Sequence, residues 1–365
     1  MTEASTKPTV NDIARVAGVS LATVDRVLNA RPGVRAVTIG KVNSAIQQLD
    51  YVRDTAAANL ARGRIYKFMF ILPASDNEFI VSLESQIAEC SHRLISDRTT
   101  LRVMKVEAFD PQAMATIITS IDPEKVDGIA ILSPETPSVR DAIDHVRAQG
   151  VQVIALVSDL PSSRRDAFVG IDNVAAGKTA GQLMGRFVQD EKGKIMVITG
   201  SLLARDHLER RLGFDSVMTS AFPKIEVLAS LEGHDDPELL EKLLPDAFDV
   251  NPDINGIYSS AAGNSGLINF LTGRGLTSKI TVVGHELTPL SRNALETGTF
   301  DAIISQDSGH LVRSAVRILR ARSDDLPINP SQEVIRIDVF LKENIPPQGG
   351  LLIENKNEEI SYENY

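Results

Sequence analysis

An arginine stands among short side chains on one face of a predicted helix near the start of the chain. Ser20 can cap this helix, which is expected over residues 21–29. On a helical wheel the apolar residues share one sector: Val24, Val27 and Leu28. The opposite sector holds Leu21, Ala22, Asp25 and Arg26. A guanidinium can form two hydrogen bonds with guanine and short neighbours allow close approach, so this face is suited to reading bases in a DNA major groove.

Two further helices are predicted around this one. Thr9 can cap an earlier helix, and Gly18 would end it in a left-handed conformation. The apolar positions of that helix follow the helical period: Val10, Ile13, Ala14 and Ala17. After a turn at 32–33, a third helix is marked by Thr38, Val42, Ile46 and Leu49. The first two helices and their glycine turn form the helix-turn-helix layout, and the third closes a three-helix bundle.

The charge of the chain is divided unevenly. The 365 residues carry a net charge of −10. Residues 1–64 contain nine Lys and Arg against five Asp and Glu, a net charge of +4, which leaves −14 for the remainder. A basic segment joined to an acidic body is typical of a modular DNA-binding protein, although an excess this mild also arises by chance. The helical motif therefore carries more weight than the charge.

Length and composition favour a cytoplasmic protein of several parts. A mass of 39.6 kDa corresponds to about two or three folding units. No run of about 18 apolar residues is present, so no membrane span is expected. The N-terminal residues lack an apolar secretory segment, and the single Cys90 excludes an internal disulfide and fits a reducing compartment.

A hinge is expected at residues 54–64, between a headpiece at 1–53 and a body at 65–350. The stretch 54–62 is rich in alanine, begins at a possible cap, Asp54, and precedes Gly63. It is too short to be stable alone, so it would be helical only when supported, and an ordinary linker is the alternative. Residues 351–365 are acidic and are expected to be a flexible tail. They lack the leucine heptads of a tetramerising coiled coil, which favours a dimer.

Apolar runs alternate with helical patterns through the body. The runs typical of buried parallel strands are 66–72, 101–106, 128–132, 151–157, 194–199, 225–231, 254–259 and 280–283. The patterns of intervening helices include 80–94, 137–149, 175–189 and 237–250. Strict alternation over this length predicts an α/β fold with parallel sheets. The spacing alone fits a barrel, one long sheet or two lobes.

The residues that commonly perform catalysis are not arranged for it. The six histidines show no metal-binding spacing, and neither a Gly-x-Ser-x-Gly elbow nor a Gly-Lys-Ser/Thr phosphate loop occurs. His285 and Glu286 could form an acid–base pair, but neighbours on a strand point to opposite faces. No enzymatic activity, cofactor or metal is therefore expected.

Two long segments of the headpiece, 10–20 (VNDIARVAGVS) and 22–29 (ATVDRVLN), continue in register through 49–51 and the hinge at Leu60 and Ala61. Together they resemble the headpiece of the lactose-repressor (LacI/GalR) family of transcriptional regulators. The resemblance implies that Leu21, Ala22 and Arg26 read bases, and that Leu60 is a wedge in the minor groove of operator DNA. It implies phosphate contacts near Ser20, Thr23, Asn29, Arg35 and Thr38.

Two positions depart from the family pattern. Asp25 stands where most members carry serine, so an anion would face the DNA. It could accept a hydrogen bond from a cytosine amino group or orient Arg26, and it would repel phosphate. Arg53-Asp54 replaces the usual Pro-Asn before the hinge, which leaves the start of the hinge less defined.

The body, through a last strand near 335–340, resembles the type I periplasmic sugar-binding-protein fold. This resemblance selects two lobes among the alternatives above. The implied N-lobe spans about 65–163 and 307–326, and the implied C-lobe about 164–306 and 327–350. The chain would cross between them near 160–166, 290–306 and 326–330. The ligand would lie in the cleft, at the carboxyl ends of the strands.

The resemblance assigns seven residues to the ligand cleft. Arg210 opens the Arg-x-x-Gly-Phe motif, and Glu286 replaces the usual aspartate after a strand. The full set is Asn77, Phe79, Asp159, Arg210, Asn264, Glu286 and Gln306. Amides, carboxylates and a guanidinium can bind vicinal hydroxyls while an aromatic face stacks on a sugar ring. The Asp172-Asn173 pair before a predicted helix is expected to cap that helix rather than to bind ligand.

These observations favour a DNA-binding transcriptional regulator that responds to a small hydroxylated ligand. Repression of carbohydrate or polyol genes, relieved by a sugar or polyol, is the leading hypothesis. A solute-binding component of a transport system is the alternative from another class, and the headpiece opposes it. A regulator that needs a non-sugar co-repressor also remains open, and so does an enzyme on the same scaffold, which the missing catalytic set opposes. The expected partners are double-stranded operator DNA and a second copy of the chain.

Overall fold

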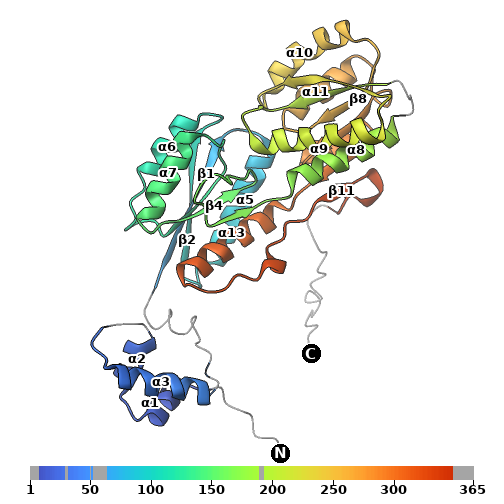
Figure 1. Cartoon of the computed structure of the whole chain (residues 1–365). Helices are drawn as coiled ribbons and strands as arrows, with labels where there is room; N and C mark the ends of the chain where they lie inside the picture. Colours follow the sequence, from blue (N-terminus) through green and yellow to red (C-terminus); the bar gives the residue numbers. More distant parts are fainter. Residues whose placement is uncertain (1–7, 29–31, 50, 52–63, 189–192, 348–365) are drawn as a thin grey trace, which may run out of the picture. The chain divides into compact units, whose positions relative to one another are not determined.

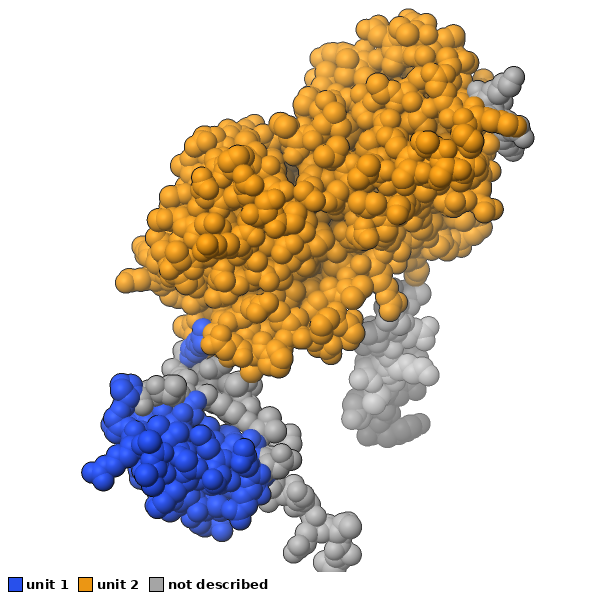
Figure 2. All heavy atoms as spheres, viewed as in Figure 1, with its two compact units in different colours: residues 1–64 blue, residues 65–365 orange. Residues whose placement is uncertain are grey.

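The computed structural model describes residues 8–28, 32–49, 51, 64–188 and 193–347. The chain divides into two compact units, residues 1–64 and residues 65–365, shown in blue and orange in Figure 2. In the ranges given, no helix has the length and apolar character needed to cross a membrane.

The N-terminal unit contains the three expected helices, α1 (Val10–Ala17), α2 (Leu21–Leu28) and α3 (Ala36–Gln48). The Thr9 hydroxyl lies 2.8 Å from Asp12 Oδ2 at the start of α1, and Gly18 ends that helix with a φ of 64°. A core of five buried residues joins the helices: Ile13, Ala17, Val24, Val42 and Ala45. The predicted bundle and both ends of α1 are therefore confirmed.

The second unit contains two sheets (Figure 1). The first has five parallel strands in the order β2-β1-β3-β4-β5. Its strands are β1 (Tyr66–Ala74), β2 (Thr99–Glu107), β3 (Gly128–Ile131), β4 (Gln152–Leu156) and β5 (Ala167–Val169). The second sheet has six strands in the order β11-β10-β9-β8-β6-β7. Its strands are β6 (Lys194–Thr199), β7 (Glu226–Glu232), β8 (Ile254–Ser259), β9 (Thr281–His285), β10 (Ala302–Ser305) and β11 (Asp338–Phe340).

Helices cover both sheets and complete two lobes. In chain order they are α5 (Glu78–Arg93), α6 (Pro111–Thr119), α7 (Pro137–Ala148), α8 (Asn173–Phe187), α9 (Arg205–Ala221), α10 (Pro237–Val250), α11 (Asn264–Gly273), α12 (Pro289–Glu296) and α13 (Ser308–Ser323). Short 3-10 turns lie at Pro330–Gln332 and Lys342–Asn344. Several helices start at an aspartate whose carboxylate accepts backbone N–H groups, as Asp110 and Asp236 do for α6 and α10.

The chain crosses between the lobes three times. It passes from β5 of the first sheet into α8, from β10 of the second sheet into α13 beside α5, and from α13 into β11 (Figure 1). The strand β5 pairs with β4, so the N-lobe continues to Val169, beyond the predicted end at 163. A strand of three residues is too short to give a recognisable apolar run. The last strand, β11, is antiparallel to β10.

Two of the expected buried strands are partly exposed. β2 and β7 lie at the edge of a sheet, and much of each strand is accessible. An edge strand has only one neighbouring strand, so its apolar residues do not require burial on both faces. One core cluster continues from the first sheet through α8 and α13 to the second sheet, and it ties the lobes into one unit.

Helices α8 and α9 pack with their backbones nearly in contact. A Cβ atom added to Gly213 would lie 2.0 Å from the carbonyl oxygen of Val174, and one added to Gly177 would lie 1.9 Å from that of Arg210. Larger residues at these two positions would force the helices apart. Gly213, the glycine of the Arg-x-x-Gly-Phe motif, thus lets α9 approach α8 closely and sets the position of Arg210 relative to α8.

Candidate functional site

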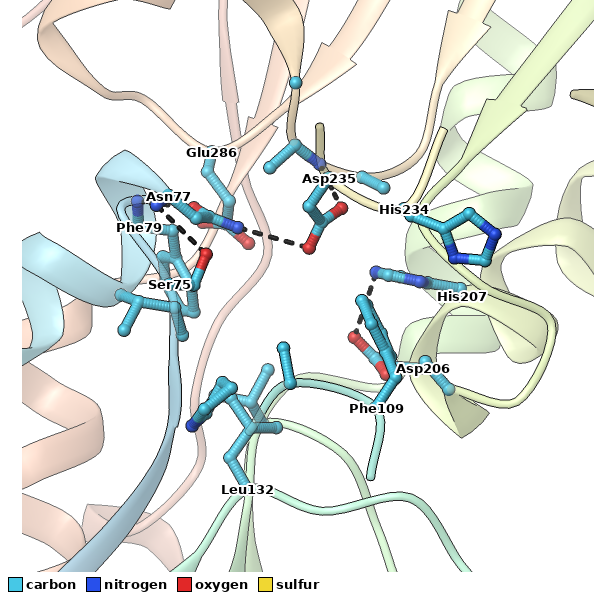
Figure 3. A pocket seen from close by; sticks show the side chains of 18 of the residues that line it. Ser75, Asn77, Phe79, Phe109, Leu132, Asp206, His207, His234, Asp235 and Glu286 are labelled. Atoms are coloured by element: carbon cyan, nitrogen blue, oxygen red, sulfur yellow. Dashed lines mark hydrogen bonds and ion pairs between the residues drawn. The ribbon is translucent and has the colours of Figure 1, made fainter. Parts of the chain in front are cut away.

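A cavity of about 490 Å³ lies between the two lobes at the carboxyl ends of their strands (Figure 3). The N-lobe contributes the segments after β1, β2, β3 and β4. The C-lobe contributes the start of α9 and the segments after β7, β8 and β9. This volume and position are those of a small-molecule site in an α/β protein.

Arg210 is the best-anchored side chain of the cavity. It lies in α9 and is only 3% exposed. Its Nε donates to Asn173 Oδ1 at 2.9 Å, and its Nη1 donates to the carbonyl oxygen of Ser260 at 2.9 Å. Its Nη2 lies 3.6 Å from Glu286 Oε1. Two neutral acceptors and one carboxylate therefore orient the guanidinium toward the cavity.

Glu286 follows directly after β9 in a left-handed backbone conformation, with a φ of 64°. Gln306 holds its carboxylate through a side-chain hydrogen bond of 2.9 Å and a backbone N–H at 3.4 Å. Burial raises the pKa of Glu286, against the opposing effects of Arg210 and Gln306. Because the chain leaves the strand at this point, His285 and Glu286 both line the cavity, contrary to the expectation that they face opposite ways.

Asp206 and His207 form a second buried pair in the first turn of α9. The backbone N–H of Ser201 donates to His207 Nδ1 at 3.2 Å. The other ring nitrogen, Nε2, lies 3.7 Å from Asp206 Oδ2. Burial would raise the pKa of Asp206, but its interactions with His207 and Arg210 and a hydrogen bond with Ser158 bring it below the ordinary value. No sequence motif marks this pair. Asp206 and His207 precede Arg210 by four and three residues, and residues with these spacings share a helix face. This spacing could have identified the pair.

Two of the contacts that join the lobes across the cavity are between side chains. Asn77 Nδ2 donates to Asp235 Oδ2 at 3.4 Å, and the rings of Phe109 and His234 meet edge to face at 6.3 Å (Figure 3). Phe109, His234 and Asp235 all have positive φ values, between 50° and 58°. Such conformations in residues other than glycine are strained, and they concentrate at functional sites.

His285 presents a buried polar atom without a partner. Its Nε2 lies 2.9 Å from the hydroxyl of Tyr258, whereas its Nδ1 has no hydrogen-bond partner among the described residues. Burial, with Arg210 and His207 nearby, lowers the pKa of His285 well below its usual value, so the imidazole is neutral. Burial likewise raises the pKa of Tyr258, whose ring stacks on Phe214 at 4.6 Å.

Five of the seven residues assigned to the cleft from the sequence line the cavity: Asn77, Phe79, Arg210, Asn264 and Glu286. Gln306 lies behind Glu286 and reaches the cavity only through it. Asp159 is outside the lining, because Arg165 binds both of its carboxylate oxygens. Asp172 caps α8 as expected, and Asn173 in addition binds Arg210.

The face of α2 proposed to read bases is exposed. Leu21 is 49% exposed, and Ala22, Asp25 and Arg26 are exposed as well, whereas Val24 is buried. Ser20 accepts the backbone N–H of Thr23 at 3.2 Å, which confirms the predicted cap.

The residues expected to contact phosphate lie mostly at helix starts. Arg35 and Thr38 are at the N-terminal end of α3, where free N–H groups favour an anion. Asn29, Leu60 and Ala61 lie outside the described residues.

Three helices with an exposed polar face and a two-lobed domain with a polar cleft define a class of modular ligand-binding proteins. Residues 9–54 match the model of bacterial regulatory proteins of the lacI family, and residues 68–325 match that of the periplasmic binding protein domain. The chain belongs to the family of LacI regulators that carry a periplasmic binding protein domain.

Named relatives agree with this assignment. Catabolite control protein A of Staphylococcus aureus is 28% identical over 191 residues, which is 51% of this chain and 53% of that protein, so the match spans about half of its length. The HTH-type transcriptional regulator pepR1 of Lactobacillus delbrueckii is 25% identical over 92% of this chain and 97% of its own. The glucose-galactose binding protein GanP of Geobacillus stearothermophilus has a TM-score of 0.70 at 22% identity, covering 78% of this chain and 100% of GanP, and shares the fold.

Proposed function

We propose that the protein is a cytoplasmic transcriptional repressor of carbohydrate or polyol genes that a small hydroxylated ligand releases from its operator. The observation that carries this proposal is the presence in one chain of an exposed α2 face that holds Arg26 and a cavity with polar groups gathered around Arg210. The regulator pepR1 aligns with 92% of this chain, a share too large to fall within the second unit alone. If the second unit lacked a cavity, the exposed helix of the headpiece would support DNA binding but not a response to a ligand.

The headpiece supports sequence-specific rather than purely electrostatic binding. Arg26 stands on the exposed face of a short helix, flanked by Ala22, whose small side chain lets the helix enter a major groove. The start of α3 supplies backbone N–H groups and Arg35 for phosphate. In this arrangement, base readout comes from α2, and the starts of both α2 and α3 supply phosphate contacts.

The cavity supports a ligand with several hydroxyl groups. Arg210 donates and Glu286 accepts at one end, Asn77 and Asn264 offer amides, and Phe79 offers an apolar face. A site of this kind discriminates against analogues that lack a hydroxyl, because its buried polar groups would then stay unpaired. The neutral His285, with its unpaired Nδ1, adds a further hydrogen-bonding atom for such a ligand.

Ligand binding can reach the headpiece through closure of the lobes. The Asn77–Asp235 and Phe109–His234 contacts both change if the lobes rotate relative to each other. A coupling of about 1–3 kcal/mol between cleft and operator is sufficient for regulation.

A second copy of the chain fits the exposed apolar groove between the C-terminal part of α5 and β2. Ile95 and Val103 are accessible there, and they line the groove together with Leu101. Single exposed residues need no explanation, but a group on adjacent elements marks an interaction surface. A dimer would present two α2 helices, and DNA-binding proteins of this kind read two half-sites.

The test combines operator selection with a ligand screen. The full-length protein is first used to select binding sites from random DNA, and the affinity for the selected operator is measured by fluorescence anisotropy. Sugars and polyols are then screened by thermal shift, and each binder is added to the operator complex. Release of the operator by a binder supports the proposal. Ligand binding without any DNA selection would instead indicate a solute-binding component.

A further inference from the structure

The walls of the cavity carry a large surplus of negative charge. Among the residues that line it are seven carboxylates and one guanidinium, that of Arg210. The C-lobe wall supplies Asp206, Asp235 and Glu286. The N-lobe wall supplies Asp76, Glu78, Glu107 and Asp110, and its lining residues include no Lys, Arg or His. Asp76, Glu78 and Glu107 are exposed and Asp110 caps α6, so solvent and backbone N–H groups meet part of this charge, but no basic side chain of the N-lobe lining does.

The compensation that exists is confined to the C-lobe end of the site. Glu286 has Arg210 at 3.6 Å, and Asp206 has His207 at 3.7 Å. Glu286 therefore already has a cationic partner within the protein, and Asp206 faces an imidazole whose Nδ1 accepts the backbone N–H of Ser201. A ligand hydroxyl can bind there without any change in the local charge.

Asp235 has no such partner. Its Oδ1 accepts the backbone N–H of Ala262 at 3.2 Å, and its Oδ2 accepts Asn77 Nδ2 at 3.4 Å, so both contacts are neutral. Within the described parts of the chain, no Lys, Arg or His forms an ion pair with this carboxylate. The strained backbone, with a φ of 58°, and the Ala262 contact fix it in place (Figure 3).

Asp235 lies at a position from which its charge can act on a bound ligand. It comes from the C-lobe but bonds to Asn77 of the N-lobe, so it lies where the two walls face each other. Closing the lobes brings the acidic N-lobe wall toward this carboxylate, and like charges oppose that movement. A positive group between the walls would convert this repulsion into attraction and would favour the closed form.

We propose that the ligand carries a cationic nitrogen that pairs with Asp235, in addition to hydroxyl groups that meet Arg210 and Glu286, so that it is an amino sugar or an aminated polyol. This assignment rests on the proposal that the cleft binds a small hydroxylated ligand. It predicts weak binding of sugar acids and sugar phosphates, because the N-lobe wall offers no cation to pair with them and Arg210 already faces Glu286.

The test compares matched probes that differ in one group. Binding to the full-length protein is measured by isothermal titration for glucose, glucosamine and glucuronate, for galactose, galactosamine and galacturonate, and for sorbitol and its 1-amino derivative. We expect at least one amine to bind about tenfold or more tightly than its neutral counterpart, and the acids to bind most weakly. In Asp235→Asn, which keeps the shape of the side chain, this preference should fall to about twofold or less.

Glu238→Gln is the matched control, since this exposed carboxylate of α10 lies close in sequence but outside the cavity lining. It should retain the full preference for the amine. A neutral or acidic member that binds best in every set, an amine preference that survives in Asp235→Asn, or a failure of every amine to bind would each overturn the assignment.

Operator affinity and its response to each probe are measured in the same samples. If a neutral sugar binds and releases the operator, the proposed function stands and the cationic ligand is refuted. If an amine binds with the expected dependence on Asp235 but no DNA is selected, the assignment of ligand class stands and the proposed function fails.

Discussion

Arg210→Ala removes the guanidinium on which three groups of the cavity depend. Asn173 and Ser260 each lose a donor at 2.9 Å, and Glu286 loses its cationic neighbour at 3.6 Å. Removing one member of a buried ion pair typically destabilises a protein by about 3–5 kcal/mol. Water can enter from the cavity and Gln306 still binds Glu286, so we expect the lower end, about 3 kcal/mol.

Urea unfolding of the full-length protein, followed by far-UV circular dichroism because the chain has no tryptophan, measures this loss. The double variant Arg210→Ala, Glu286→Gln removes the unpaired charge and should recover about 1–2 kcal/mol. Ligand-induced thermal stabilisation should disappear in both variants. Operator affinity should be unchanged, because α2 belongs to the other compact unit.

The pH dependence provides an independent check on the same reasoning. Burial raises the pKa of Glu286 above its unfolded value and Arg210 opposes that rise, so the pKa should rise further in Arg210→Ala. The loss of stability of Arg210→Ala relative to the wild type should therefore be small below the pKa of Glu286 in the unfolded chain. It should grow as the pH rises through the pKa of Glu286 in the folded protein. A loss under about 1 kcal/mol at neutral pH, together with normal ligand binding, would refute the role of Arg210.

Three other predictions follow from the headpiece and the cavity. Arg26→Ala should weaken operator binding by about 1–3 kcal/mol and relax preference at one symmetric pair of positions; uniform weakening over all operator variants would make it a phosphate contact. Asp25→Ser should raise non-specific DNA affinity and reduce discrimination between operators in titrations at two salt concentrations, since an anion opposes phosphate binding; no change in either would leave Asp25 without a role in readout. His285 is neutral when folded and protonates on unfolding, so stability should fall by up to roughly 1.4 kcal/mol per pH unit as the pH drops below its unfolded pKa of 6.5; His285→Phe should reduce this slope, and an unaltered slope would contradict the burial argument.

The sequence predicted those parts of the molecule that local patterns determine. The caps at Thr9 and Asp172 depend on one side chain and the next turn, and the exposed face of α2 follows from the helical period. Long apolar runs likewise identified the central strands, because a strand buried on both faces is apolar along its own sequence. By contrast, β5 has only three residues and gains its structure from pairing with β4, which no local pattern records.

The site was predictable to the extent that a single motif marked each residue. Asn77 and Arg210 lie where their motifs place them. Asp159 follows a strand as a ligand residue would, but Arg165 lies close in the folded chain and binds it instead. Asp235 reaches the cavity through a left-handed turn, and a turn of that kind is set by tertiary contacts rather than by residue type.

The three crossings between the lobes determine how this protein can be recombined with others. Each lobe is assembled from separate stretches of the chain, since α13 joins the N-lobe after most of the C-lobe has been made. A single crossover anywhere within residues 65–347 would therefore leave at least one lobe assembled from two parent sequences and disrupt the shared core. Only the boundary at Arg64 and Ile65 separates complete units. New regulators of this type are thus expected to arise by exchange of headpieces at that boundary, with ligand preference changing through substitutions such as those at Asp235.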